Sequence, residues 1–123
     1  MTEEGEKELG EKLLQTIRGA RLSSVQFVLD YLMLGFDEKG ALTTLVWPEV
    51  TSNGSTLKFG DPGYRDCLCS LITHVVEDVK IGGDETIMVH FREGSLVTIR
   101  LQSRGSECER AIFTGPKNVL FTW

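Results

Sequence analysis

The sequence predicts an α+β fold in a single domain, residues 1–123, made mostly of antiparallel β-hairpins with one amphipathic helix packed on the sheet and a further short helix at the N-terminus. Three observations predict it. The 123 residues match the size of one ordinary domain. Apolar residues alternate along several stretches that end at Gly-containing turns, the pattern of hairpin strands. The run Gly-Asp-Pro-Gly-Tyr at positions 60–64 opens a segment with helical spacing.

Residues 6–20 are expected to form the short N-terminal helix. Its apolar positions recur at helical spacing and are Leu9, Leu13, Leu14 and Ile17. Gly10 and Gly19 each weaken a helix by up to ~1 kcal/mol relative to Ala. This helix therefore needs a surface on which to lie.

Residues 24–36 alternate as one strand in which both faces are largely apolar. Val28, Leu32, Leu34 and Phe36 fall on one side, and Val25, Phe27, Leu29, Tyr31 and Met33 fall on the other. Three arrangements cover both faces: a central strand in the fold, the N-terminal helix over one face, or a second copy of the chain in a homodimer. We favour the helix as the cover.

The turn at residues 37–40 leads into a strand over residues 41–47. A bulged loop with Gly40 in the left-handed conformation pairs Phe36 with Leu42 and Leu34 with Thr44. Pro48 is expected to end this strand, and residues 51–55 are expected to form a polar turn before a short strand over residues 56–59.

The amphipathic helix is predicted over residues 62–73. Asp61 can cap its free amides, and Pro62 is tolerated at the first helical position. Its apolar stripe consists of Tyr64, Cys67, Leu68, Leu71, Ile72 and Val75.

The last third of the chain is predicted to be mainly hairpins. A strand over residues 74–81 precedes strands 86–91 and 96–102, and a three-residue loop over residues 92–94 pairs Val89 with Val97 and Ile87 with Ile99. Residues 103–110 are expected to be a loop. Residues 111–113 and 119–123 are expected to be short strands around the turn at residues 115–118.

Charge and composition exclude several classes of partner. The chain carries 13 Lys and Arg against 18 Asp and Glu, a net charge of −5, and has no basic cluster, so nucleic acid is not expected as a partner. The start is acidic, and no apolar run approaches the ~20 residues that span a bilayer, so we expect a cytoplasmic protein without a membrane partner. The three cysteines do not form a disulfide framework and are expected to be reduced.

Metal, cofactor and catalytic patterns are weak. Cys67 and Cys69 are two residues apart, which on a helix turns their thiols about 200° apart, so they cannot share an ion even with His74, His90 or Cys108 nearby. No cysteine stands in a signature of a nucleophilic Cys–His pair, and the carboxylates show neither calcium-loop spacing nor a clear acid–base pair. We therefore expect no metal, no cofactor and no catalytic residue, which makes an enzyme the less favoured class.

The candidate binding residues are Trp47, Tyr64, Arg65 and His90. Trp, Tyr and Arg are enriched where proteins bind other proteins, and His90 falls on the face of its hairpin that points away from Ile87, Val89 and Phe91. Core packing of Trp47 and Tyr64 is the competing interpretation.

The chain resembles a family of small bacterial proteins of unknown function. The resemblance rests on Val25 to Tyr31, on Trp47-Pro48-Glu49-Val50, on the run from Gly60 to Cys69 and on the terminal Trp123. It extends over residues 25–123 and leaves out the N-terminal helix; the family is usually richer in Pro and acidic residues after Leu101 than this chain is. The resemblance implies no activity and no catalytic residue.

Two functions follow as hypotheses. The first is a non-catalytic protein-binding module, immunity-like or regulatory in role. The alternative is a small-molecule-binding protein or enzyme whose pocket lies between the helix over residues 62–73 and the sheet, and uses His90, Tyr64 or Asp66.

Overall fold

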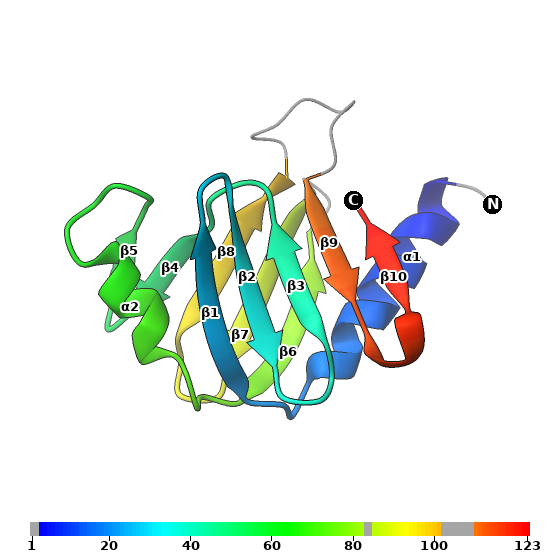
Figure 1. Cartoon of the computed structure of the whole chain (residues 1–123), viewed down its shortest axis with the longest axis horizontal. Helices are drawn as coiled ribbons and strands as arrows, with labels where there is room; N and C mark the ends of the chain where they lie inside the picture. Colours follow the sequence, from blue (N-terminus) through cyan, green and yellow to red (C-terminus); the bar gives the residue numbers. More distant parts are fainter. Residues whose placement is uncertain (1–2, 83–84, 102–109) are drawn as a thin grey trace.

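The computed structural model describes residues 3–82, 85–101 and 110–123, and shows two antiparallel sheets that face each other across one core (Figure 1). The first sheet has the strand order β1-β2-β3-β9-β10 and the second has the order β5-β4-β8-β7-β6. One buried cluster contains residues of both sheets and of both helices. The α+β class and the dominance of antiparallel sheet are confirmed.

The first sheet consists of β1 (Leu22–Val28), β2 (Tyr31–Phe36), β3 (Ala41–Thr44), β9 (Ala111–Thr114) and β10 (Leu120–Thr122). A short 3-10 turn, Pro116–Asn118, joins the last two strands. The second sheet consists of β4 (Glu49–Ser52), β5 (Ser55–Leu57), β6 (Val76–Ile81), β7 (Thr86–Phe91) and β8 (Leu96–Arg100). The loop predicted over residues 103–110 lies, apart from Arg110, outside the described residues.

The single strand predicted over residues 24–36 is wrong, because the chain turns at Leu29 and Asp30 into a β1–β2 hairpin. The turn contains neither Gly nor Asn, the residues that mark most two-residue hairpin turns. The alternation also changes phase across it: Phe27 pairs with Leu32 on the core side. The two apolar faces predicted for one strand are therefore largely the one inner face of two strands.

The hairpin registers differ in how well the sequence predicts them. In β7–β8, Val89 lies opposite Val97 and Ile87 opposite Ile99, as the three-residue loop predicts. In β2–β3, Leu34 lies opposite Leu42, so the predicted pairing of Phe36 with Leu42 is wrong by two residues. A slip of two keeps every side chain on its predicted face, which is why the pattern could not distinguish the two registers.

Strand β4 is absent from the sequence prediction, which ended the preceding strand at Pro48 and read residues 51–55 as a turn. The chain leaves the first sheet after Thr44 and enters the second at Glu49. Val50 is fully buried between Leu57 and Val97. The link through Trp47 and Pro48 is thus the crossing between the two sheets.

Helix α1 (Glu3–Leu14) and the 3-10 turn Gln15–Ile17 close one open side of the sandwich, where they contact β6, and α1 also contacts β10 (Figure 1). Leu14 and Ile17 are fully buried there. The predicted role of this helix as a cover for the second face of residues 24–36 is wrong, because it lies at the far edge of the sandwich from the β1–β2 hairpin.

Helix α2 (Tyr64–Ser70) closes the opposite open side, where it contacts β1 and β4. Its stripe buries Tyr64, Leu68 and, just after it, Leu71. The predicted start is wrong: Gly63, in the left-handed conformation, is the N-cap residue. The carboxylate of Asp61 instead accepts a hydrogen bond from the amide of Lys58 at 2.8 Å, so it closes the preceding turn.

The two sheets differ in their solvent-facing sides. The outward strand positions of the first sheet carry no charge, and we call this set the uncharged face: Ser24, Gln26, Val28, Tyr31, Met33, Gly35, Ala41, Thr43, Ile112, Thr114, Leu120 and Thr122. The outward side of the second sheet carries Glu49, Asp78, Lys80, His90 and Arg100. Among the described residues, neither helix has the length and apolar content that crossing a membrane requires.

Candidate functional site

A groove of about 410 Å³ lies between the tip of the β1–β2 hairpin and the N-terminal end of α2. We call it the hairpin groove. Its lining comes from four separate segments and consists of Phe27, Val28, Leu29, Trp47, Phe59 and Arg65. Two of the predicted binding residues, Trp47 and Arg65, are therefore together in one site.

Stacked aromatic rings form one wall of the hairpin groove. The ring centroids of Trp47 and Phe59 are 4.3 Å apart and their planes differ by 21°. The Phe59 ring also meets Tyr64 edge to face, with centroids 6.0 Å apart. Even so, 47% of Phe59 remains exposed, so this aromatic residue offers a large apolar surface to solvent.

The hairpin tip brings further apolar surface to the same place. Leu29 is 90% exposed and Val28 is 36% exposed. Among the described residues six large hydrophobic side chains are exposed, and three of them, Val28, Leu29 and Phe59, line this one groove. Exposed apolar residues scattered singly need no explanation, but a cluster of them indicates a site of interaction.

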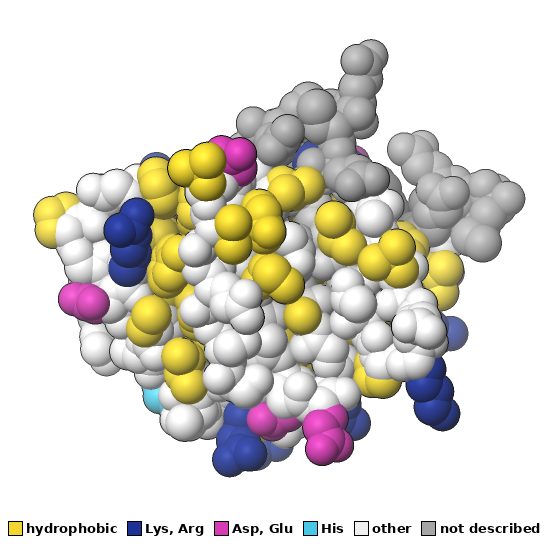
Figure 2. Space-filling model, viewed as in Figure 1, with side chains coloured by type: hydrophobic (Ala, Val, Ile, Leu, Met, Phe, Trp, Pro, Cys, Tyr) yellow, Lys and Arg dark blue, Asp and Glu magenta, His cyan; other side chains and the backbone are white. Residues whose placement is uncertain are grey.

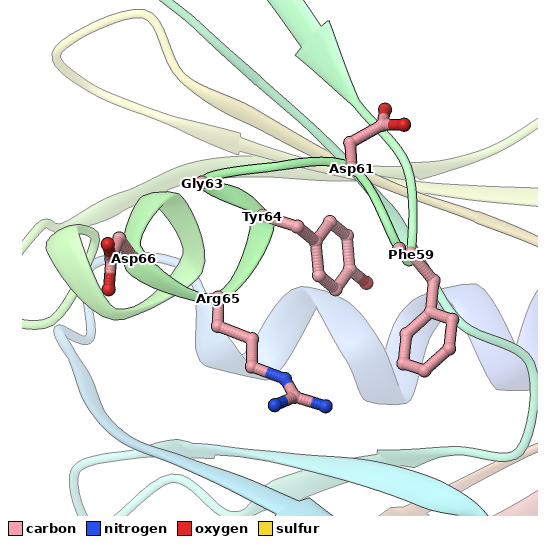
Figure 3. A pocket seen from close by; sticks show the side chains of 7 residues that line it. Phe59, Asp61, Gly63, Tyr64, Arg65 and Asp66 are labelled. Carbon is pink, nitrogen blue, oxygen red and sulfur yellow. The ribbon is translucent and has the colours of Figure 1, made fainter.

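Arg65 supplies the charge of the groove. Its guanidinium carbon lies 5.6 Å from the centroid of the Phe27 ring, a cation–π contact. No ion pair joins Arg65 to another described residue. Figure 3 shows its side chain extending away from that of Asp66, so its donors are free to bind an incoming acceptor.

Tyr64, the third predicted binding residue, is only 2% exposed and contributes little contact surface. Its hydroxyl donates a hydrogen bond to the Pro48 carbonyl, and burial raises the pKa of the phenol well above its usual range. This bond ties α2 to the segment that carries Trp47. Tyr64 therefore positions two sides of the groove relative to each other.

A smaller depression of about 280 Å³ adjoins the groove at Phe59 and Arg65, beside α2. Asp61, Tyr64 and Asp66 also line it. Figure 3 shows that the side chains of Asp61, Arg65 and Asp66 point in different directions. A catalytic or small-molecule site requires polar groups that converge on one point. The polar groups of this depression do not converge.

His90, the fourth predicted binding residue, lies elsewhere. It stands on the outward side of the second sheet, paired with Leu96 and Asp78, and lines neither the groove nor the depression. The structure thus does not bring it to the residues on α2.

The other histidine, His74, takes part in a polar cluster beyond the C-terminal end of α2. Its Nδ1 lies 3.0 Å from Oε1 of Glu93, whose carboxylate also accepts hydrogen bonds from the amide and hydroxyl of Ser95. Desolvation by itself raises the pKa of Glu93. The hydrogen bonds from Ser95 and the nearby His74 outweigh the desolvation, so the pKa lies below its usual value. Because the carboxylate stands between the hydroxyl and the imidazole, His74 is not placed to activate Ser95 as a nucleophile.

The surroundings of Cys67 disfavour a reactive thiolate. Burial, with a contribution from the negative charge of Glu93, raises the pKa of the half-buried Cys67 thiol, which disfavours the nucleophilic thiolate. Cys69 is exposed, and Cys108 lies outside the described residues. Within the described part of the chain, no group of three or more His, Cys, Asp or Glu side chains could hold a metal ion.

Sequence reasoning missed Phe27, Leu29 and Phe59 as site residues. Phe27 and Leu29 were assigned to a continuous strand, and Phe59 to the end of another. The available signal was an apolar residue on each side of a turn: Leu29 directly before Asp30, and Phe59 directly before the Gly60-Asp61 turn.

No family model, no curated protein and no solved structure matches the chain. The assignment of function therefore rests on the geometry of the groove.

Proposed function

We propose that this protein is a non-catalytic protein-binding module that receives its partner in the hairpin groove. The observation that carries the proposal is the gathering of exposed Leu29 and Phe59 around Trp47 and Arg65. Trp and Arg are the residue types that contribute most to binding energy at protein interfaces, particularly where an apolar rim excludes water around them.

The groove suggests how a partner would dock. An apolar side chain of the partner, placed between Leu29 and Phe59, removes both from water and completes the aromatic wall. The guanidinium of Arg65 can then donate hydrogen bonds to a carboxylate or carbonyl oxygen beside that side chain. Burying a fully exposed Leu contributes about 1.5–3 kcal/mol, so Leu29 alone is a substantial contact.

The overall charge favours a partner that is basic as a whole. A net charge of −5 accelerates the approach of a positively charged protein and slows that of an acidic one. An immunity-like or regulatory protein that neutralises a basic target fits both the charge and the apolar groove. Its association rate is expected to fall as salt is added, because screening weakens long-range attraction.

The alternative, a small-molecule-binding protein or enzyme beside α2, has less support. It called for His90, Tyr64 and Asp66 around one cleft. His90 lies on the outward side of the second sheet, and the Tyr64 hydroxyl is already bonded to Pro48. We therefore favour the protein-binding function.

The test compares what the intact protein and its variants recover from a lysate of the organism that encodes it. Leu29→Asp and Arg65→Glu change exposed groove residues, and Leu9→Asp is the matched control, since Leu9 is 40% exposed but lies on α1. A partner recovered in stoichiometric amount by the intact protein and by the Leu9 variant should be lost by both groove variants.

Titration calorimetry with the purified partner then gives the magnitude. Each groove variant is expected to weaken binding by about 2 kcal/mol, roughly 30-fold, as for a typical interface hot spot. Equal affinity for the intact protein and both groove variants would exclude the groove as the binding site.

A further inference from the structure

We infer that the hairpin groove binds an extended segment of the partner, which adds to the free edge of β1 as an antiparallel strand and places an acidic side chain beside Arg65. The inference rests on the protein-binding function proposed above and states which kind of segment is bound. Strand addition of this kind gains affinity from main-chain hydrogen bonds and specificity from alternate side chains.

Within the described residues, β1 is the longest of the four strands that lie at a sheet edge. It has seven residues, whereas β5 and β10 have three each. The six-residue β6 is covered, because side chains of α1 and of the turns after it bond to the backbone of Glu77, Val79 and Ile81. Folded proteins usually protect long edges from further pairing, so an unprotected stretch of β1 indicates a place that receives another strand.

The start of β1 already pairs with another part of the chain. The carbonyl of Leu22 accepts a hydrogen bond from the Thr73 amide at 2.7 Å, and the Leu22 amide donates to the His74 carbonyl at 2.9 Å. An antiparallel bridge joins Arg21 to Val75 directly beside them. The chain itself therefore adds an antiparallel segment to the first part of this edge.

Near the hairpin tip the same edge is unpaired. Val28 pairs with Tyr31 across a two-residue turn, and the pair that closes such a turn is hydrogen-bonded. Hydrogen-bonded and non-hydrogen-bonded pairs alternate along an antiparallel ladder, so the N–H and C=O groups of Phe27 point away from β2. No hydrogen bond joins either group to a described residue. Phe27 thus offers one donor and one acceptor to an incoming strand.

These free groups lie beside an unpaired cation. The edge of β1 faces α2, and the hairpin groove lies between the hairpin tip and the start of that helix (Figure 1). A residue that pairs with Phe27 therefore enters the groove, and its side chain falls on the same side of the sheet as the Phe27 ring. The guanidinium carbon of Arg65 lies 5.6 Å from the centroid of that ring. An acidic side chain at this position would meet a guanidinium that no described residue binds in an ion pair.

The alternation of a strand places the next contact. Two residues from the acidic one, toward the hairpin tip, the side chain on the same side reaches the exposed Leu29 and Phe59. Figure 2 shows hydrophobic side chains over this hairpin and beside α2, with a basic side chain among them. Because an antiparallel segment runs from the tip toward Phe27, its apolar residue comes two positions before its acidic residue.

Synthetic peptides titrated into the full chain test this arrangement by calorimetry. The probe is acetyl-Lys-Thr-Leu-Thr-Glu-Thr-Lys-amide. Replacing its Glu by Gln, replacing its Leu by Ser, or exchanging the two should each lower the affinity at least tenfold. The protein variant Arg65→Glu should also lose the probe, whereas Leu9→Asp, on α1, is the control and should bind it like the unmodified protein.

Methylation of single peptide nitrogens separates main-chain pairing from side-chain contacts. The N–H of the peptide's Glu is the donor expected to bond to the Phe27 carbonyl, so methylating that nitrogen should lower the affinity at least tenfold. The N–H of the preceding Thr points away from β1, and its methylation is the matched control that should leave binding unchanged. In the complex, hydrogen exchange at the Phe27 amide should slow, whereas exchange at Gln26, already paired with Met33, should be unaltered.

Three results would overturn the inference. One is a probe that does not bind at millimolar concentration. Another is equal affinity when the Glu nitrogen is methylated, and the third is equal affinity for Arg65→Glu. Each of them leaves the proposed function standing where both groove variants lose the partner recovered from the lysate. Retention of that partner by Leu29→Asp and Arg65→Glu would instead refute the proposed function.

Discussion

The two open sides of this sandwich are closed by helices in different ways. On the β6 side, three residues of α1 and the turns after it bind the backbone of the edge strand: the Glu11 carboxylate accepts from the Ile81 amide, the Gln15 amide donates to the Val79 carbonyl, and Arg18 donates to the Glu77 carbonyl. On the β1 side, the seven-residue α2 buries Leu68 and leaves the hairpin groove open beside it. One side seals an edge that could otherwise pair with another strand, and the other presents apolar surface to solvent.

The comparison shows that two helices with equally buried leucines can have different roles: α1 covers a sheet edge, whereas α2 also positions residues of the hairpin groove. Leu14 of α1 and Leu68 of α2 are both fully buried in the same core. Only α2 also positions groove residues, through Arg65 and the Tyr64–Pro48 bond. We therefore expect substitutions in α1 to change stability alone and substitutions in α2 to change both stability and partner binding.

The largest effects are expected from truncating these two leucines. Leu14→Ala and Leu68→Ala should each lower the free energy of unfolding by 2–5 kcal/mol, on the order found for cavities in other cores. Urea denaturation measures this loss. Partner binding should be weakened by Leu68→Ala and unchanged by Leu14→Ala at a temperature where both variants are folded. Equal loss of affinity in the two variants would mean that the two sides are not separable.

The next effect concerns Gly10, which lies in the middle of α1. A Cβ at this position would stand 2.8 Å from the Phe121 ring and 3.0 Å from Nε1 of Trp123. Ala is normally the better helix residue by ~1 kcal/mol. Here Gly10→Ala should destabilise the fold by about 1–3 kcal/mol because the helix or the two aromatic rings must shift to admit the Cβ.

A double-mutant cycle checks the cause assigned to Gly10. Phe121→Leu makes room beside the helix, so Gly10→Ala should cost less in that background than in the unmodified protein. A gain in thermal stability from Gly10→Ala alone would contradict the close contact.

A smaller effect is expected from Tyr64→Phe, which deletes the hydroxyl bonded to Pro48. Because the carbonyl loses a buried partner, the free energy of unfolding should fall by about 1–3 kcal/mol. The emission of Trp47, read with Trp123 replaced by Phe, should shift as its segment loosens. An unchanged spectrum with unchanged partner affinity would show that this bond does not position the groove.

Removing a hydrogen bond between α1 and the edge strand β6 should have a smaller and more local effect on stability. Glu11→Ala removes the acceptor of the Ile81 amide, a hydrogen bond of 3.1 Å. Its net contribution is about 0.5–1.5 kcal/mol, and amide exchange at Ile81 should accelerate accordingly. Glu8→Ala, on an exposed position of the same helix, is the control and should leave that exchange rate unaltered.

The smallest effect depends on pH. The folded state lowers the pKa of Glu93 below its usual value of 4.5, so this carboxylate contributes stability above that pH and loses the contribution as the pH falls through its folded pKa. Glu93→Gln should therefore be less stable than the unmodified protein near neutral pH, with the difference shrinking in acid. A difference that is constant from neutral to acidic pH would contradict the stabilising role assigned to the Glu93 carboxylate and its hydrogen bonds from Ser95.

Several features could be predicted from residue order because they depend on local periodicity. The three-residue loop gave the β7–β8 register since only that pairing kept Ile87 and Val89 facing apolar partners. The stripe through Tyr64, Leu68 and Leu71 likewise identified the buried side of α2. Of the candidate site, Trp47 and Arg65 were found by residue type alone, and Tyr64 was found but with a different role.

The amino-acid sequence by itself determined which side chains avoid water, and it indicated the β2–β3 and β7–β8 hairpins. Both follow from repeats of two and 3.6 residues along the chain and from Gly-containing turns. Tertiary structure decided that residues 24–36 fold back at Leu29, that the chain crosses between two sheets at Pro48, and that α1 lies against β6 and β10. It also decided that Phe27, Trp47 and Phe59 line one groove. These contacts join residues far apart in the chain, and their free energy exists only once both sheets share one core, so no local pattern contains it.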